Sequence, residues 1–300
     1  MQHDKTSRGR ISWWSAACIV LVAAAAGTAK AQEILPNDLV PAPAGTNAVL
    51  GYYAYGHNTE LNVAGGKTFK DNTGLEINLG VGRYVHYFNL SGMPAGWQVF
   101  QAFGSLSGAR VDGQGVGSAF GATNLGLGLF FWPYSNDATK THVIISTYLF
   151  PPTGTYDRNA GINVGDNRWR GDALLGINQG VTDNISFDAS VDTMFYGNNN
   201  EPAVGARLSQ SPSYRFQTFF NYAWNKSLVT SLGYEGTFGG DQQLDKVFSG
   251  NKTESHRARA VASYFWTSAF QTLLEVNRDI EVKGGFKQAI GVQLRALYVF

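Results

Sequence analysis

Apolar and polar residues alternate with a period of two along most of the chain after residue 47. In the last such segment, Ile290, Val292 and Leu294 share one face of an extended chain. Gln293 and Arg295 fall between them and therefore share the opposite face. We count twelve segments of this kind: 48–58, 73–88, 97–108, 122–133, 141–151, 169–181, 185–196, 213–224, 228–239, 255–266, 270–282 and 288–300. The pattern predicts an all-β protein of about twelve strands, although merging or splitting 97–134 would give ten or fourteen.

The connections between these segments alternate between short and long. Short turns are expected at 182–184, 225–227 and 267–269. Long polar stretches rich in Gly, Asn and Asp lie at 152–168, 197–212 and 240–254. An even number of strands with such connections is typical of a closed antiparallel transmembrane β-barrel of the outer membrane. The barrel must close because lipid offers no hydrogen bonds to a free sheet edge. We expect the short turns to face the periplasm and the long loops to face outward.

Two further features favour this barrel over a secreted β-sandwich. The tryptophans after residue 31 all fall at predicted strand ends, as in the aromatic belts of membrane barrels. They are Trp97, Trp132, Trp169, Trp224 and Trp266. In the second half of the chain, nearly all charged residues within strands fall on the polar face, which would line the lumen. A sandwich would turn its polar face outward instead.

The first 31 residues have the composition of a secretory signal peptide. A basic start with Lys5, Arg8 and Arg10 precedes an apolar stretch at 11–27. The sequence Ala-Lys-Ala at 29–31 then matches the small-x-small site of signal peptidase.

The chain therefore divides into three parts. Residues 1–31 are the predicted signal peptide, 32–46 an irregular tether at the periplasmic mouth, and 47–300 the barrel. The one cysteine, Cys18, lies in the signal peptide, so we expect no disulfide in the mature protein. The net charge of +1 argues against a nucleic-acid partner. The predicted location is the bacterial outer membrane, with its lipid as a partner.

Several short stretches resemble one particular bacterial family. They are residues 41–47 (PAPAGTN), 152–157 (PTGTYD), 163–169 (NVGDNRW), 237–240 (TFGG) and 285–287 (GFK). They are similar to the family labelled "putative MetA-pathway of phenol degradation", whose members are often called transporters. The resemblance implies an outer-membrane β-barrel found near pathways that degrade aromatic or other hydrophobic compounds. The ending Tyr298-Val299-Phe300 is similar to the signal that the barrel-assembly machinery recognises. The family supplies no catalytic or ligand residues that could be carried over.

Charged residues on the predicted lumen face suggest a constriction. Centring one hairpin on Ser268 places Arg257 opposite Asp279. The same register places Arg259 opposite Asn277. Centring the last hairpin near Gly285 makes Glu275 face Arg295, which predicts a charged ladder near mid-height. The residues expected at the constriction are Arg215, Glu235, Arg257, Arg259, Glu275, Asp279 and Arg295. They would orient a solute and tune ion selectivity, or would form an ion-pair network that closes a narrow barrel.

The 152–168 stretch is the candidate gating loop, with Tyr156, Asp157 and Asp166 as its candidate residues. It would fold over the mouth or inward; the alternative is a solvated surface loop. Four scattered histidines after residue 31 predict neither a metal site nor a cofactor. His142 and Ser146 share a strand face but lie about 13 Å apart, too far for direct proton transfer. A cross-strand Ser–His pair stays open, and no catalytic residue is assigned.

We therefore predict a non-enzymatic outer-membrane channel for the passive uptake of small hydrophobic or aromatic molecules. The preference for aromatic solutes rests on the family resemblance. Lumen aromatics such as Tyr148, Tyr196, Phe219 and Phe265 would offer an apolar track or only packing. The alternatives are a lipid-modifying barrel enzyme and a closed structural or adhesion barrel.

Overall fold

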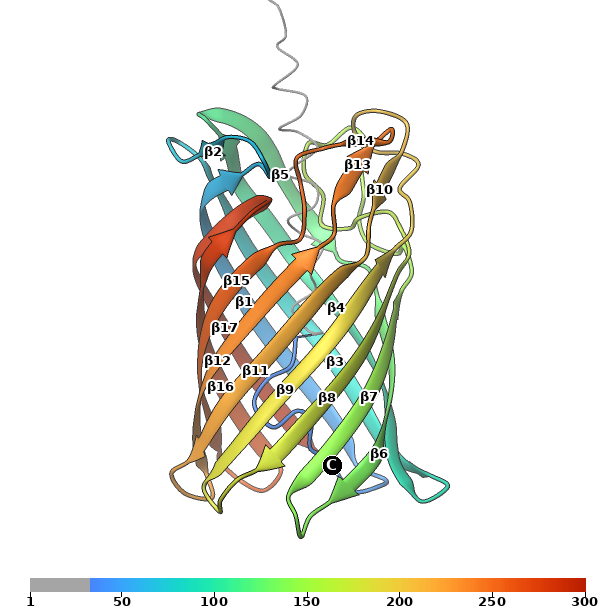
Figure 1. The fold of residues 1–300 in the computed structure, drawn as a ribbon, viewed down its shortest axis with the longest axis vertical. Helices are drawn as coiled ribbons and strands as arrows, with labels where there is room; N and C mark the ends of the chain where they lie inside the picture. The colour runs from blue at the N-terminus through green and yellow to red at the C-terminus, as the bar shows by residue number, and fades with distance from the viewer. Residues whose placement is uncertain (1–32) are drawn as a thin grey trace, which may run out of the picture.

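The wall of the molecule is a closed barrel of twelve antiparallel strands (Figure 1). The computed structural model describes residues 33–300, so the predicted signal peptide, 1–31, lies outside the described residues. The wall strands are β1 (Asn47–Asn62), β3 (Gly74–Leu90), β4 (Met93–Val111), β6 (Gly126–Asn136), β7 (Thr141–Phe150), β8 (Arg170–Gly180), β9 (Ile185–Tyr196), β11 (Ser213–Ala223), β12 (Leu228–Gly239), β15 (Ser255–Phe265), β16 (Phe270–Val282) and β17 (Gly285–Val299). Strand β17 pairs with β1 from Val299 to Gly285 and closes the barrel. The predicted fold class is confirmed.

Five further strands lie near the end that carries the long loops. They are β2 (Thr68–Phe69), β5 (Gln114–Ala122), β10 (Leu208–Gln210), β13 (Gln242–Leu244) and β14 (Val247–Phe248). Of these, β2 and β5 pair with wall strands, whereas β10, β13 and β14 form a separate small sheet. The long strand β4 pairs with β6 through its first half and with β5 through its second half. The predicted strand 122–133 therefore spans the last residue of β5, the intervening residues 123–125 and most of β6. Among residues 33–300, no helix has the length and apolarity needed to cross a membrane.

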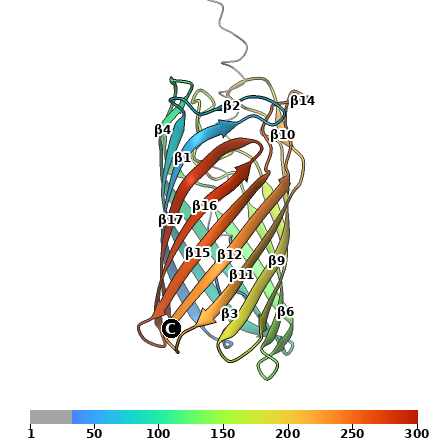
Figure 2. The same ribbon diagram turned by 60° about the vertical axis from the view of Figure 1, so that its left-hand side comes forward.

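The barrel has two unlike ends (Figure 2). We call the end with the connections 91–92, 137–140, 181–184, 224–227 and 266–269 the turn rim. The opposite end, with the connections 151–169, 197–212 and 240–254, is the loop rim. Side chains stabilise the turns: the Asn225 carboxamide oxygen accepts hydrogen bonds from two backbone N–H groups of its own turn, at 2.8 and 2.9 Å.

The outward face of the wall is apolar, as a lipid-facing surface must be. Exposed side chains on it include Leu129, Leu175, Val191, Leu232 and Ile280. Trp97, Trp224 and Trp266 are exposed near the turn rim and Trp169 near the loop rim, as predicted for interface belts. The prediction is wrong for Trp132.

Trp132 is buried inside the barrel, where its indole N–H donates to the backbone oxygen of Leu39 at 2.8 Å. The cause is strand parity. Trp132 has the same parity along β6 as the inward-facing Phe130, so its ring points into the lumen.

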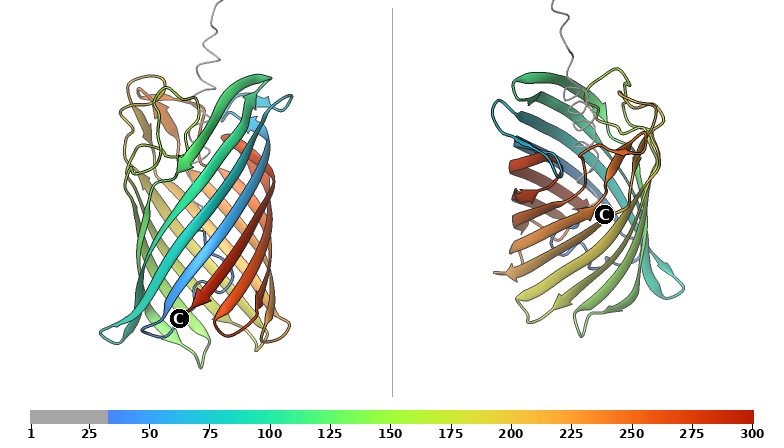
Figure 3. Two further views of the ribbon diagram at one scale, coloured as in Figure 1. Left: turned by 180° about the vertical axis from the view of Figure 1, so that it is seen from behind. Right: turned by 45° about the horizontal axis from the view of Figure 1, so that its top comes forward.

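Residues 33–46 run irregularly inside the barrel rather than in its wall (Figure 3). Pro41, Ala42 and Ala44 lie near the turn rim, where they line a pocket with Phe88 and Pro94. The preceding residues, Glu33 to Leu39, continue inward to mid-height and are buried there for the most part. We call Glu33–Leu39 the lumen segment.

Candidate functional site

The lumen is bounded by two chemically different walls. Strands β1, β3, β4, β6 and β7 form the apolar wall, whose buried side chains include Leu50, Leu79, Val81, Phe100, Trp132 and Ile144. Strands β8, β9, β11, β12 and β15–β17 form the charged wall, whose inward side chains include Asp188, Asp192, Arg215, Glu235, Arg257, Arg259, Glu275, Asp279 and Arg295. The sequence separates the two walls because few charged residues of the first half of the chain face the lumen; Arg83 on β3 is one that does.

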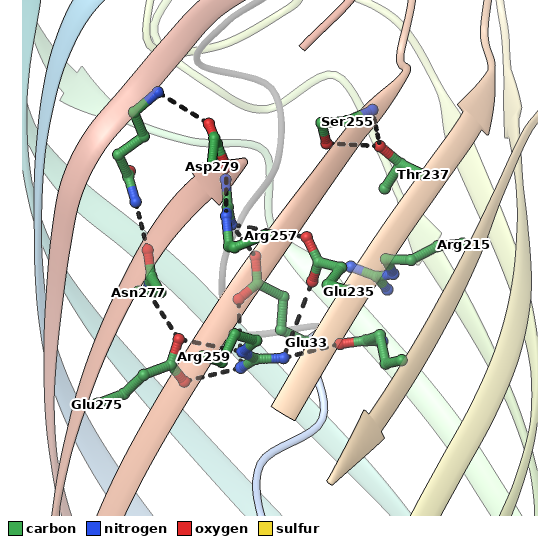
Figure 4. A network of polar contacts seen from close by, with 12 residues as sticks. Glu33, Arg215, Glu235, Thr237, Ser255, Arg257, Arg259, Glu275, Asn277 and Asp279 are labelled. Carbon is green, nitrogen blue, oxygen red and sulfur yellow. Dashed lines mark hydrogen bonds and ion pairs between the residues drawn. The ribbon is translucent and has the colours of Figure 1, made fainter. Parts of the chain in front are cut away.

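Arg259 lies at the centre of the charged wall (Figure 4). Its Nε and Nη2 atoms donate to the two carboxylate oxygens of Glu275 at 3.1 and 2.8 Å, a bidentate pair. Its Nη1 donates to the Gln217 carboxamide oxygen at 3.2 Å. The guanidinium carbon of Arg259 also lies 4.7 Å from the ring centroid of Phe219, a cation–π contact. Packing and hydrogen bonds together fix this side chain, which is fully buried.

Arg257 joins the carboxylates of three different elements. Its Nε donates to Asp279 on β16 at 2.8 Å. Its Nη1 lies 3.6 Å from a carboxylate oxygen of Glu235 on β12 and 3.5 Å from one of Glu33 in the lumen segment. Arg215 on β11 forms a separate ion pair with Asp192 on β9 at 2.9 Å. Five of the predicted constriction residues, including Glu275 and Arg259, therefore meet Glu33 in one charge network.

The registers of the last strands test two of the predicted pairings directly. Arg257 lies opposite Asp279 and Arg259 opposite Asn277, as predicted. The predicted pairing of Glu275 with Arg295 is wrong, because Glu275 lies opposite Gln293. In that hairpin Asn277 lies opposite Gly291, so its centre falls one residue before Gly285 and the pairing shifts by two residues.

Arg295 instead belongs to a second polar group nearer the turn rim. Its Nη1 donates to the Asp38 carboxylate of the lumen segment at 2.8 Å, and its Nη2 to Gln271 at 2.7 Å. Tyr52 on β1 lies directly opposite Arg295. The Tyr52 hydroxyl accepts a hydrogen bond from Arg83 on β3 at 3.3 Å. The predicted ladder of Arg259, Glu275 and Arg295 is thus two separate groups.

The lumen segment bridges the two walls. On the charged side, the Ile34 N–H donates to Gln217 at 3.2 Å and the Asn37 N–H to Asp188 at 3.0 Å. On the apolar side, Ile34, Leu35 and Leu39 belong to the buried core of the lumen. Sequence reasoning missed this role. The signal that could have shown it was the spacing of the two acidic residues, Glu33 and Asp38, among the apolar residues of 33–40.

Cavities lie on both sides of the lumen segment. Toward the loop rim, a polar cavity of about 150 Å³ is lined by Arg168, Arg170, Tyr196, Arg257 and Asp279, among others. Toward the turn rim, a cavity of about 230 Å³ is lined by Asp38, Arg83 and Arg295 together with apolar side chains. The segment and the charge network therefore lie between two open regions of one lumen.

The long loop at 151–169 folds partly into the loop-rim end of the barrel. Ile162 and Val164 are buried against Leu61, Leu75 and other inward side chains of β1, β3 and β4.

The candidate gating residues lie in this loop. Asp166 is buried near the guanidinium groups of Arg168 and Arg170, at 3.3 and 3.2 Å. The Tyr156 hydroxyl donates to the backbone oxygen of Glu201 at 2.7 Å, which ties this loop to the next. Asp157 stabilises its own loop: its backbone N–H donates to Asn163 at 2.7 Å.

Comparison with known proteins agrees with this architecture. Residues 53–296 match the model of the family described as "Putative MetA-pathway of phenol degradation". The chain belongs to this family. The crystal structure of the COG4313 outer membrane channel from Pseudomonas putida F1 is similar, with 26% identity and a TM-score of 0.84, over 89% of this chain and 100% of that chain. The Pseudomonas putida toluene transporter TodX shares the fold at 10% identity and a TM-score of 0.51, over 94% of this chain and 96% of that one. No curated protein matches the sequence.

The membership and the closed barrel place this phenol-degradation family protein in the bacterial outer membrane. The similar structures are those of a channel and a transporter. Within the described part of this chain, a Ser–His contact lies at the turn rim, where Ser135 Oγ and His142 Nδ1 are 2.9 Å apart across β6 and β7. His142 Nε2 is 3.9 Å from the Asp137 carboxylate, too far for the hydrogen bond that would orient a catalytic base. Within residues 33–300, no three His, Cys, Asp or Glu side chains are grouped to hold a metal ion.

Proposed function

We propose that the protein is a passive outer-membrane channel for small hydrophobic or aromatic molecules. The observation that carries this proposal is the pair of cavities on either side of the lumen segment, which apolar and charged walls both border. A solute would enter past the long loops, slide along the apolar wall and leave at the turn rim.

The two walls support different parts of this task. Apolar contacts are non-directional and individually weak, so a ring can move along Leu79 toward the loop rim, Ile144 beside the lumen segment and Leu50 toward the turn rim without a large barrier. The charge network on the facing wall, centred on Arg257 and Arg259, would form the constriction and select solutes by their charge. The aromatic preference draws on the family membership and on the toluene transporter that shares the fold.

The lumen segment is the proposed gate of this channel. Glu33 and Asp38 attach it to the charged wall by ion pairs, and Leu39 attaches it to the apolar wall. The loop residues Tyr156, Asp157 and Asp166 would order the outer mouth rather than close the constriction. We further propose that Phe300 and its neighbours, at the turn rim, engage the barrel-assembly machinery.

Uptake by whole cells tests the proposal. Bacteria that carry the protein in a lipopolysaccharide-containing outer membrane should take up labelled phenol faster than cells without it, and arabinose at an unchanged rate. Ile144→Thr, on the apolar wall, should slow phenol uptake. Ser190→Thr is the control: it places a threonine on the charged wall and should leave phenol uptake unchanged. A folded barrel in the outer membrane that does not accelerate phenol uptake would overturn the proposal and favour a closed structural barrel.

A further inference from the structure

Arg83 is unusual among the arginines that face the lumen. Within residues 33–300, the other lumen arginines on the wall strands each have a carboxylate oxygen within 3.2 Å. Arg83 has no ion pair among these residues: its Nη1 donates to the Tyr52 hydroxyl, and its buried Nε has no hydrogen-bond partner. Arg83 is half-buried, and a cation in such a position without an anion is costly, so this group is poised to bind one.

Arg295 brings a second guanidinium to the same place. It lies opposite Tyr52 in the sheet, and Tyr52 is the residue that Arg83 contacts. Arg295 is paired with Asp38 through Nη1, but its buried Nε is also without a partner in the described chain. Two guanidinium groups and one carboxylate, paired with Arg295 only, therefore line this place, which leaves one positive charge in excess.

The space next to these two arginines is amphipathic. The cavity of about 230 Å³ toward the turn rim is lined by three charged residues, Asp38, Arg83 and Arg295. The remainder is bordered largely by apolar side chains: Leu50, Val85, Phe265, Leu297 and Val299. A ligand that suits this cavity has one anionic group and a compact apolar body.

We infer that Arg83 and Arg295 form a binding site for the carboxylate of an aromatic acid. This inference rests on the proposed channel function and narrows its substrate class. The ring would lie against Val85, Phe265 and Leu297, while the carboxylate accepts hydrogen bonds from both guanidinium groups. Asp38 is the resident carboxylate of this site, so an incoming acid competes with it and releases the lumen segment from Arg295.

Calorimetric titration of the purified mature protein in detergent, with benzoate as the probe and benzyl alcohol as its uncharged analogue, tests the site. Arg83→Gln breaks no ion pair and should weaken benzoate binding about tenfold, the size expected for one charged hydrogen bond. Asp38→Asn removes the competing carboxylate and should strengthen benzoate binding. Lys226→Gln, an exposed cation at the turn rim, is the matched control and should change nothing. Benzyl alcohol binding should respond to none of these changes.

Unchanged benzoate affinity in Arg83→Gln would overturn the site, as would an Asp38→Asn protein that binds benzoate more weakly than the wild type. These results are separable from the uptake experiment. Faster phenol uptake with benzoate binding that does not depend on Arg83 rejects the site and keeps the channel. Arg83-dependent binding in a protein that does not accelerate uptake keeps the site and rejects the channel.

Discussion

The apolar wall and the charged wall line the same lumen but are stabilised by different forces. On the apolar wall, Phe100 and Phe150 meet edge to face with ring centroids 5.9 Å apart, and neighbouring side chains fill the space around them. On the charged wall, Arg259 and Glu275 are both buried and each compensates the other. Truncating a side chain of the apolar wall leaves a void, whereas removing one member of an ion pair in the charged wall leaves an uncompensated charge.

This difference indicates what each wall can contribute to transport. An apolar surface holds many solutes weakly and in many orientations, because dispersion and burial are non-directional. A fixed ion-pair network selects by charge and position and adapts poorly, because each of its members has a partner. The lumen segment, with carboxylates toward one wall and Ile34, Leu35 and Leu39 in the apolar core, matches both surfaces at once.

The largest effect is expected from Arg259→Met. Loss of the guanidinium leaves Glu275 without its cation and leaves Arg257 to pair with both Glu235 and Glu33, so the free energy of unfolding should fall by about 3–5 kcal/mol. Urea unfolding of the refolded barrel in detergent, followed by tryptophan fluorescence, measures it.

The control for this variant lies on the neighbouring strand. Arg278 on β16 is exposed on the outward face, and Arg278→Met should cause no loss of stability. Equal losses in the two variants would contradict the view that the charged wall is a compensated network.

An intermediate effect is expected from Leu39→Ala, which tests the apolar side of the lumen segment. Leu39 is buried beside Ile144 and against Gly176, whose missing side chain leaves room for it. Removing three carbon atoms of Leu39 should lower the free energy of unfolding by about 2–3 kcal/mol. Val40→Ala, one residue further along at a half-buried position, should cost clearly less in the same assay. If Val40→Ala costs as much as Leu39→Ala, the segment is not anchored by the apolar wall.

The smallest effect is expected at the loop rim, where ion pairs are partly exposed. The side-chain amines of Lys252 and Lys283 each approach Glu254 to 2.6 Å, and their hydrogen bonds lower the pKa of the Glu254 carboxyl. The stabilisation is therefore present above the ordinary glutamate pKa of about 4.3 and is lost as the pH falls through the lower folded value. At pH 7, Glu254→Gln should accelerate hydrogen exchange in residues 240–254 by an amount equivalent to no more than about 1 kcal/mol. The difference between the variant and the wild type should shrink as the pH falls below about 4.3 and through the lower folded value. A difference that stays constant down to the most acidic pH at which the barrel remains folded would argue against this pair.

The wall was predictable because membrane barrels follow a strict period. Strand ends of β9 and β16 agree with the expected segments to the residue. Register is strongly specified in such a wall, because a one-residue slip in pairing would move every apolar side chain to the wrong face. The pairing of Arg257 with Asp279 followed from a short turn of fixed length. The pairing of Glu275 failed because a shift of one residue in a hairpin centre moves the partner by two.

The interior was less predictable, because the lumen segment has no period to recognise. Its position depends on contacts to residues more than ninety positions away, such as the hydrogen bond from Trp132 to Leu39. The inward position of Trp132 was missed because strand-end location was given more weight than parity along β6. Side-chain reach also mattered: Arg259 lies opposite Asn277 but forms its bidentate pair with Glu275, two residues away.

Single-channel conductance in planar bilayers tests the central claim most directly, namely that the lumen segment closes a path between two open cavities. The mature chain should show small or rare openings. A variant that lacks Glu33–Leu39, with its folding checked by heat-modifiable migration, should show larger and steadier currents. Glu33→Gln with Asp38→Asn, which keeps the segment but removes its ion pairs, should fall between the two. Equal conductance of the folded wild type and the folded deletion variant would contradict the claim.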